Sequence, residues 1–98
     1  MPESLLTVVA HIHAKPGKEE ELRGALLALV APTRVEDGCV QYDLHVNTES
    51  PGKFVFYENW TSKAHLDAHL ATPHLKAFGD RRAELVEEMQ ILTFTRIA

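Results

Sequence analysis

The alternation of apolar and polar positions along the chain predicts four β-strands. Residues 5–14 (LLTVVAHIHA) are rich in β-branched side chains and are followed by a Pro-Gly pair, and residues 39–46 (CVQYDLHV) alternate strictly. Residues 54–60 follow after a short loop of turn-forming residues, so we expect the second and third strands to pair as antiparallel neighbours. Residues 91–97 (ILTFTRI) form the fourth strand.

The first helical stretch covers residues 18–31. Three consecutive glutamates occupy its first turn, where acidic groups favour the positive end of the helix dipole, and leucines form an apolar stripe. We expect Pro32 to end this helix, because proline cannot donate a backbone hydrogen bond. Gly24 weakens the middle of the helix, which indicates a close backbone contact at that point.

The second helical region is predicted in two pieces. Thr61 or Ser62 caps the first piece, and Thr72-Pro73 is a cap followed by a first-turn proline that begins the second. The apolar face of the second piece continues as far as Met89. The resulting order β-α-β-β-α-β predicts an α+β fold of the ferredoxin-like type, with helices on one face of a four-stranded sheet.

The parity of positions along the strands assigns side chains to the two faces of this sheet. Those expected on the helix-covered face, where a pocket could lie, are Tyr42, Tyr57 and Asn59. Those expected on the opposite face are Phe56, Glu58 and Trp60. The first strand is apolar on both faces over much of its length, so the opposite face also needs a cover. A second copy of the chain is a natural cover, and we expect a homodimer.

Length and composition limit the classes of function. The 98 residues fit one domain, 1–98, and the net charge of −4 argues against a nucleic-acid partner, which needs a basic surface. The single cysteine, Cys39, cannot form an internal disulfide and is expected to be an unreactive buried thiol. The first residues lack a signal pattern and no apolar run is long enough for a membrane span, so we expect a cytoplasmic protein without a membrane span.

Histidines are the main candidates for chemistry. His69 lies on the inward stripe of its helix, where it would serve either as a general base at the polar end of a pocket or as a core histidine with a hydrogen-bond partner. His65 lies to one side of that stripe and is expected to face solvent. His65, His69 and His74 have spacings that suggest a metal site, but no acidic third ligand occurs at a familiar spacing, so we expect no metal.

A second group of histidines lies on the strands. His11, His13 and His45 share a parity class with Glu58, and these side chains could converge. A polar subunit interface is the simpler interpretation of this group. The sequence has no Gly-rich phosphate loop, no GxSxG and no CxxC motif, which argues against nucleotide-binding, serine-hydrolase and thioredoxin-like functions.

Three segments resemble the antibiotic biosynthesis monooxygenase family, and its quinol monooxygenase-type members most. They are AKPGKEEEL (residues 14–22), EDGCVQYDL (residues 36–44) and YENWTSKAHLDAHLATPHLKAF (residues 57–78), of which the last is the most specific. The resemblance implies a ferredoxin-like subunit that pairs sheet to sheet into a dimeric α+β barrel. It also implies an oxygenase with no cofactor, in which a small aromatic substrate such as a quinol or phenol is deprotonated and reacts with O2.

The resemblance also implies roles for particular residues. His69 would be the base, and Tyr57, Asn59 and Tyr42 would orient the substrate. The remaining residues expected to line the substrate pocket are His74, Phe78, Phe94 and Ala10. Some family members degrade haem with an Asn–Trp–His set, and all three matching positions differ here, which argues against that activity.

Two other functions stay open at this stage. Other family members isomerise a small phosphorylated signalling sugar and carry a Thr-Pro-His segment, which occurs here as Thr72-Pro73-His74. A non-catalytic small-molecule-binding dimeric barrel is the third possibility, because a fold does not fix a function.

Overall fold

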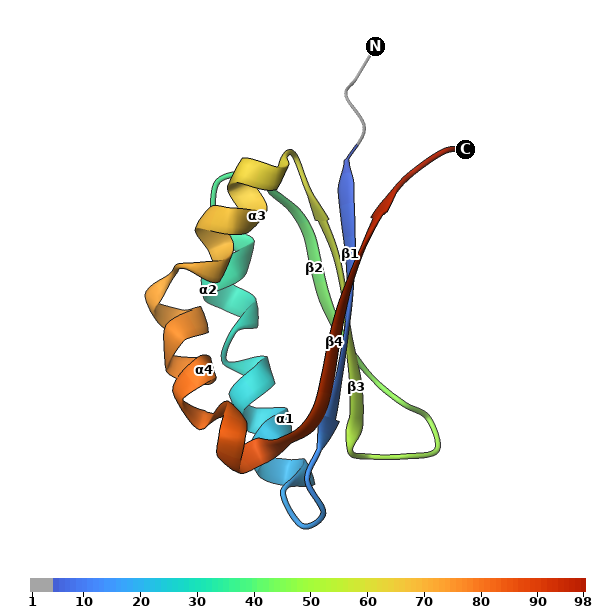
Figure 1. The fold of residues 1–98 in the computed structure, drawn as a ribbon, viewed down its shortest axis with the longest axis vertical. Coiled ribbons are helices and arrows are strands. Elements are labelled where there is room, and N and C mark those ends of the chain that lie inside the picture. Colours follow the sequence, from blue (N-terminus) through green and yellow to red (C-terminus); the bar gives the residue numbers. More distant parts are fainter. Residues whose placement is uncertain (1–4) are drawn as a thin grey trace.

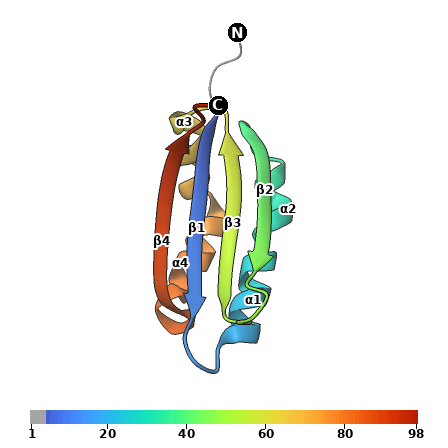
Figure 2. The same ribbon diagram turned by 90° about the vertical axis from the view of Figure 1, so that its right-hand side faces the viewer.

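A computed structural model describes residues 5–98 (Figure 1). Its elements are β1 (Leu6–Ala14), α1 (Glu19–Leu27), α2 (Val30–Arg34), β2 (Cys39–Val46), β3 (Lys53–Trp60), α3 (Lys63–Leu70), α4 (Pro73–Leu85) and β4 (Val86–Thr95). The strands form a four-stranded antiparallel sheet in the order β2-β3-β1-β4. All helices lie on one face, and Figure 2 looks onto the other, which we call the open face. The predicted ferredoxin-like α+β fold is confirmed.

The first helical stretch is not the continuous helix that we expected. It breaks after Leu27 and resumes as the short helix α2, in which Pro32 lies near the start. Proline is tolerated there because the backbone N–H groups of the first turn have no partner within the helix. The expected close contact at Gly24 is also wrong, since a methyl group built on it would meet no atom within 4 Å.

The second helical region follows its predicted caps. The Ser62 hydroxyl accepts a hydrogen bond from the backbone N–H of His65, and the Thr72 hydroxyl accepts one from that of Leu75. The boundary with the last strand was predicted too late, because β4 begins at Val86, directly after the end of α4. Pairing of Val86 with Ala14 and of Met89 with Ile12 outweighs the helical spacing of these apolar residues.

The predicted assignment of β3 side chains to the two faces is inverted. Tyr42 of β2 pairs with Glu58, not with Tyr57, so even-numbered positions of both strands share the helix-covered face. Because side chains alternate, a slip of one residue moves the whole set to the other face. A carboxylate ordinarily indicates the solvent-facing side of a strand, but Glu58 is only 5% exposed and lies among apolar side chains.

The core lies between the helices and the sheet. Its largest fully buried side chains include the aromatic groups of β3 and leucines of the helices, namely Phe54, Phe56, Trp60, Leu22, Leu26 and Leu85. In the part of the chain that the structure describes, no helix has the length and apolar character needed to cross a membrane. A cavity lies between the helices and the sheet.

Candidate functional site

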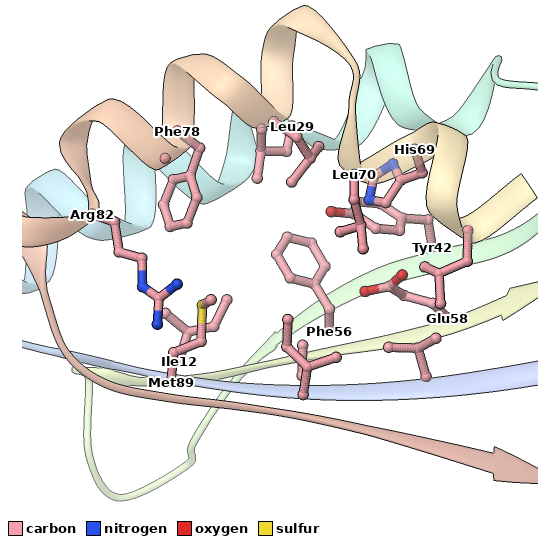
Figure 3. Close-up of a pocket in the computed structure, with 16 residues that line it drawn as sticks. Ile12, Leu29, Tyr42, Phe56, Glu58, His69, Leu70, Phe78, Arg82 and Met89 are labelled. Atoms are coloured by element: carbon pink, nitrogen blue, oxygen red, sulfur yellow. The ribbon is translucent and has the colours of Figure 1, made fainter. Parts of the chain in front are cut away.

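A cavity of about 280 Å³ lies between the sheet and the helices α3 and α4 (Figure 3). Most of its wall is apolar and includes Val8 and Ile12 of β1, Phe56 of β3 and Phe78 of α4. Such a wall excludes water and suits a flat hydrophobic ligand, while a few polar groups set the orientation of that ligand.

The polar groups lie at opposite ends of the cavity. Figure 3 shows Tyr42, Glu58 and His69 gathered at one end, and the guanidinium group of Arg82 at the other, beside Met89. Arg82 is exposed, so its end of the cavity is open to solvent, whereas His69 is only 2% exposed. The buried histidine therefore lies at the end of the cavity remote from the exposed Arg82.

His69 is held by aromatic rings and by a carboxylate. Its ring lies 4.6 Å from that of Trp60 and 5.4 Å, edge to face, from that of Tyr42, measured between centroids. Its Nδ1 atom lies 2.9 Å from Oε2 of Glu36, a residue of the loop between α2 and β2. When Nδ1 carries the ring proton and donates a hydrogen bond to Glu36, Nε2 carries the free lone pair and can act as a base.

Glu36 also binds a second histidine. Nε2 of His74 lies 2.7 Å from the same carboxylate oxygen, so one oxygen atom joins the end of α3 to the start of α4. Thr72 fixes the junction between the two helices, because its hydroxyl donates a 2.8 Å hydrogen bond to the carbonyl oxygen of His69. Glu36 therefore holds the side chains of both histidines, and the Thr72 hydrogen bond holds the backbone between them.

Burial sets the protonation of the groups at this end. Loss of hydration lowers the pKa of His69, against the opposing effect of Glu36, and so favours the neutral imidazole. Burial also raises the pKa of Tyr42, which keeps its hydroxyl a donor. Burial raises the pKa of Glu58 to about 7, with a smaller contribution from the charge of Glu36, while a hydrogen bond from Trp60 acts in the opposite direction.

The structure brings together only some of the predicted site residues. Ala10, Tyr42, His69 and Phe78 line the cavity as expected. His74 does not line the cavity, and its connection to the site is the hydrogen bond to Glu36, which also contacts His69.

Three predicted site residues lie on the open face instead. Asn59 accepts a hydrogen bond from Thr7 and donates one to Gln41 across the sheet. Tyr57 is 40% exposed, and Phe94, which pairs with Thr7, is 49% exposed. The parity of β3 was inverted for Tyr57 and Asn59, and the register of β4 with Thr7 of β1 puts Phe94 on the same face as Asn59.

The remaining histidines are outside the cavity. His11, His13 and His45 line a shallow depression on the open face, and Glu58 is not among them because it lies on the other side of the sheet. His65 is half-buried rather than solvent-facing, with Nδ1 lying 2.7 Å from the hydroxyl of Ser62. Partial burial raises the pKa of Cys39, which fits an unreactive thiol.

Three residues of the site were not identified from the sequence as belonging to it. Glu36 and Arg82 have no predicted role, and Glu58 is predicted on the wrong face of the sheet. A carboxylate among alternating aromatic residues, as in the segment FVFYENW, was the available signal for Glu58. Glu36 and Arg82 had no such signal, because each reaches the site only through the packing of distant segments.

Comparison with known sequences identifies a family and several relatives. The family described as "Antibiotic biosynthesis monooxygenase" matches residues 5–81. The "Probable quinol monooxygenase YgiN" of Escherichia coli is 38% identical over 89% of this chain and 93% of its own length. An uncharacterised Synechocystis protein is 29% identical, and the matched region spans 63% of its length.

Solved structures agree with this relationship. The crystal structure of PA3566 from Pseudomonas aeruginosa superposes with a TM-score of 0.96 at 38% identity, over 100% of this chain and 99% of that one. The structure of Rv0793 from Mycobacterium tuberculosis has a TM-score of 0.89 at 30% identity, over 97% of each chain. The chain belongs to the antibiotic biosynthesis monooxygenase family.

Proposed function

We propose that this protein oxidises a quinol or a related phenol with O2, without a metal, flavin or haem cofactor. The observation that supports this most strongly is a buried histidine, His69, held by Glu36 at the polar end of an apolar cavity. The name of the Escherichia coli relative supports the same substrate class. The proposal needs only a base, a donor and a dry cavity, because the substrate itself supplies the electrons.

The cavity volume sets the size of the substrate. A cavity of about 150 Å³ in another protein holds one benzene molecule. The cavity of about 280 Å³ in this chain therefore suits two fused rings, such as those of a naphthol or naphthoquinol. The hydroxyl group of the substrate would lie at the end of the cavity that carries His69, and the rings of the substrate would lie against Phe56 and Phe78.

The chemistry begins with removal of a proton. Nε2 of neutral His69 accepts the hydroxyl proton, and Glu36 stabilises the imidazolium that forms. Tyr42, a protonated donor at the same end of the cavity, stabilises the phenolate. The phenolate reduces O2; one oxygen atom bonds to ring carbon, and the other leaves as water with two hydrogen atoms of the quinol. The product is a hydroxyquinone when the substrate is a quinol and a quinone when it is a phenol such as 1-naphthol, and no external reductant is required.

The apolar wall favours this reaction over sugar isomerisation. A phosphorylated sugar carries hydroxyl groups along its whole length, and each would lose hydration against Val8, Ile12 or Phe56 without gaining a partner. A fused aromatic ring has no such cost. Arg82 would suit a phosphate group, but the rest of the cavity wall does not suit a sugar and favours an aromatic substrate.

The proposal includes assembly into a homodimer through the open face. Tyr57 and Phe94 expose apolar surface there, and a second copy of the sheet would cover both side chains. Light scattering should then give a mass of twice the 11.0 kDa of one chain. A species of 11.0 kDa at micromolar concentration would contradict this part of the proposal.

Isotope labelling tests the reaction itself. Purified protein treated with a chelator would be incubated with menadiol or 1-naphthol under labelled O2, and the product would be analysed by mass spectrometry. We expect one labelled oxygen atom in the organic product, formed faster than in protein-free buffer. Labelling at the spontaneous rate would contradict an oxygenase function for these substrates.

A further inference from the structure

The most unusual cluster of polar groups lies behind the cavity wall. Glu36 Oε2, His69 Nδ1 and His74 Nε2 all lie within 4.8 Å of one another. Two imidazole rings and one carboxylate are a common ligand set for Zn²⁺ and related ions. The spacing of the histidines along the helices had suggested a metal, but the third ligand was missing; Glu36 supplies it from a loop more than 30 residues upstream.

We infer that Glu36, His69 and His74 form a binding site for a divalent transition-metal ion, with Zn²⁺ as the best-matched ion, and that occupancy switches off His69 as a base. The second half of this inference rests on the function proposed above. The first half does not, because metal binding is measured without any substrate.

The geometry requires only a small adjustment. Zn²⁺ lies about 2.0–2.2 Å from nitrogen and oxygen ligands, so ligand atoms around it are separated by about 3.3 Å. The two contacts of Glu36 are 2.9 and 2.7 Å, so these pairs must open by about half an ångström. The two histidine nitrogen atoms, which lie within 4.8 Å of each other, must take the same spacing. The Glu36 and His74 side chains are 14% and 22% exposed, so both have room to move and solvent can supply the remaining ligand.

The backbone around the three ligands is fixed. The Thr72 hydroxyl donates to the carbonyl oxygen of His69 and caps the helix that begins beside His74. The backbone N–H of Glu36 donates to the carbonyl oxygen of Thr33 at 3.0 Å. Ligands held on a rigid frame lose little entropy when the ion binds, which distinguishes this set from a chance meeting of flexible surface residues.

The effect on His69 follows from its two nitrogen atoms. A metal ion on Nδ1 takes the lone pair of that atom, so the ring proton moves to Nε2. Nε2 then carries a proton and cannot accept one from a substrate. The His74 ring changes tautomer in the opposite sense, from Nε2–H to Nδ1–H. Bound Zn²⁺ should therefore abolish turnover while leaving the cavity open.

Titration calorimetry with Zn²⁺ alone tests the site on the tag-free, full-length chain. We expect one ion per chain, and visible absorption bands when Co²⁺ replaces Zn²⁺. His74→Gln should weaken binding by about 100-fold or more, since loss of a direct ligand exceeds the effect of losing an outer partner. The glutamine amide can still donate to Glu36, so this variant keeps the helix junction, as circular dichroism would verify.

His13→Ala is the matched control. His13 also faces a carboxylate, with Nδ1 lying 3.2 Å from Oε1 of Glu88, but within residues 5–98 this pair belongs to no cluster of three metal-ligating side chains. Its loss should leave the stoichiometry and affinity unchanged. Absence of stoichiometric binding, or binding that survives His74→Gln and disappears in His13→Ala, would overturn the metal site.

The two proposals fail separately. If chelated protein oxidises a quinol but binds no Zn²⁺, the metal site is wrong and the oxygenase proposal stands. If Zn²⁺ binds at these residues but chelated protein has no oxygenase activity, the metal site stands and the function is wrong. If Zn²⁺ binds and turnover continues with the site saturated, the inferred switch is wrong.

Discussion

Glu36 Oε2 lies 2.9 Å from Nδ1 of His69, although 33 positions separate the two residues in the sequence. This contact joins the loop before β2 to the last turn of α3 and directs the lone pair of His69 to Nε2. The proposed chemistry depends on that tautomer, and several consequences can be measured.

Replacing Glu36 with glutamine should reverse the tautomer of His69. The amide group of Glu36→Gln can donate a hydrogen bond to Nδ1, which would leave the proton on Nε2. We expect kcat for quinol oxidation to fall by about 10²-fold or more, as an Asp-to-Asn change does beside a catalytic histidine. Steady-state kinetics would measure this, and an unchanged kcat with native circular dichroism would rule out the orienting role of Glu36.

Glu58 should make stability depend on pH in a defined direction. Its pKa is about 7 in the fold against an ordinary value of 4.5, so between these values the folded chain holds a proton that the unfolded chain releases. Stability contributed by this group is therefore lost as pH rises through that window, by about 3 kcal/mol at most. Urea unfolding at pH 5 and pH 8 would measure it.

The matched variant for this measurement is Glu58→Gln, which cannot ionise. The difference in unfolding free energy between variant and parent should shift in favour of the variant as pH rises, and subtraction removes the contributions of all other groups. A difference that does not change with pH would mean that Glu58 is not buried in the way described.

Tyr42 and Tyr57 form a natural pair of controls, because one lines the cavity and the other lies on the open face. Tyr42→Phe removes a donor at the reacting end, and we expect kcat to fall by about 10²-fold. Tyr57→Phe should leave kcat unchanged. Equal losses in the two variants would contradict the face assignment or the donor role of Tyr42.

Arg82 should favour substrates that carry a negative charge at the end remote from the reacting hydroxyl. We expect Arg82→Ala to raise KM about tenfold for a naphthoquinol with a carboxylate substituent, and little for a neutral one, because a charged hydrogen bond is lost. Arg81→Ala is the control, since Arg81 pairs with Glu21 on the surface. A KM that rises equally for both substrates would argue against charge recognition.

The fold was predictable from local patterns. The first three strand segments, the Ser62 and Thr72 caps and the order of elements were evident from residues close together in the sequence, whereas the start of β4 was not. The break between α1 and α2 was not, because Pro32 suits a helix start as well as a helix end.

The site was only partly predictable. The spacing of α3 identified His69 as inward, but the faces of β3 depended on a register that one buried carboxylate, Glu58, obscured. Glu36 could not be assigned at all, because its partners come from segments far along the chain and no local pattern encodes that contact. Sequence patterns therefore located the histidine but not the residue that orients it.

The central claim is that His69 removes the proton that starts the reaction with O2. An oxygen electrode would record uptake by the chelated protein with menadiol or 1-naphthol, for the parent chain, for His69→Ala and for His45→Ala, an exposed control on β2. We predict a fall of about 10²- to 10⁴-fold in kcat for His69→Ala and no change for His45→Ala. Oxygen uptake by His69→Ala at the rate of the parent chain would contradict the account.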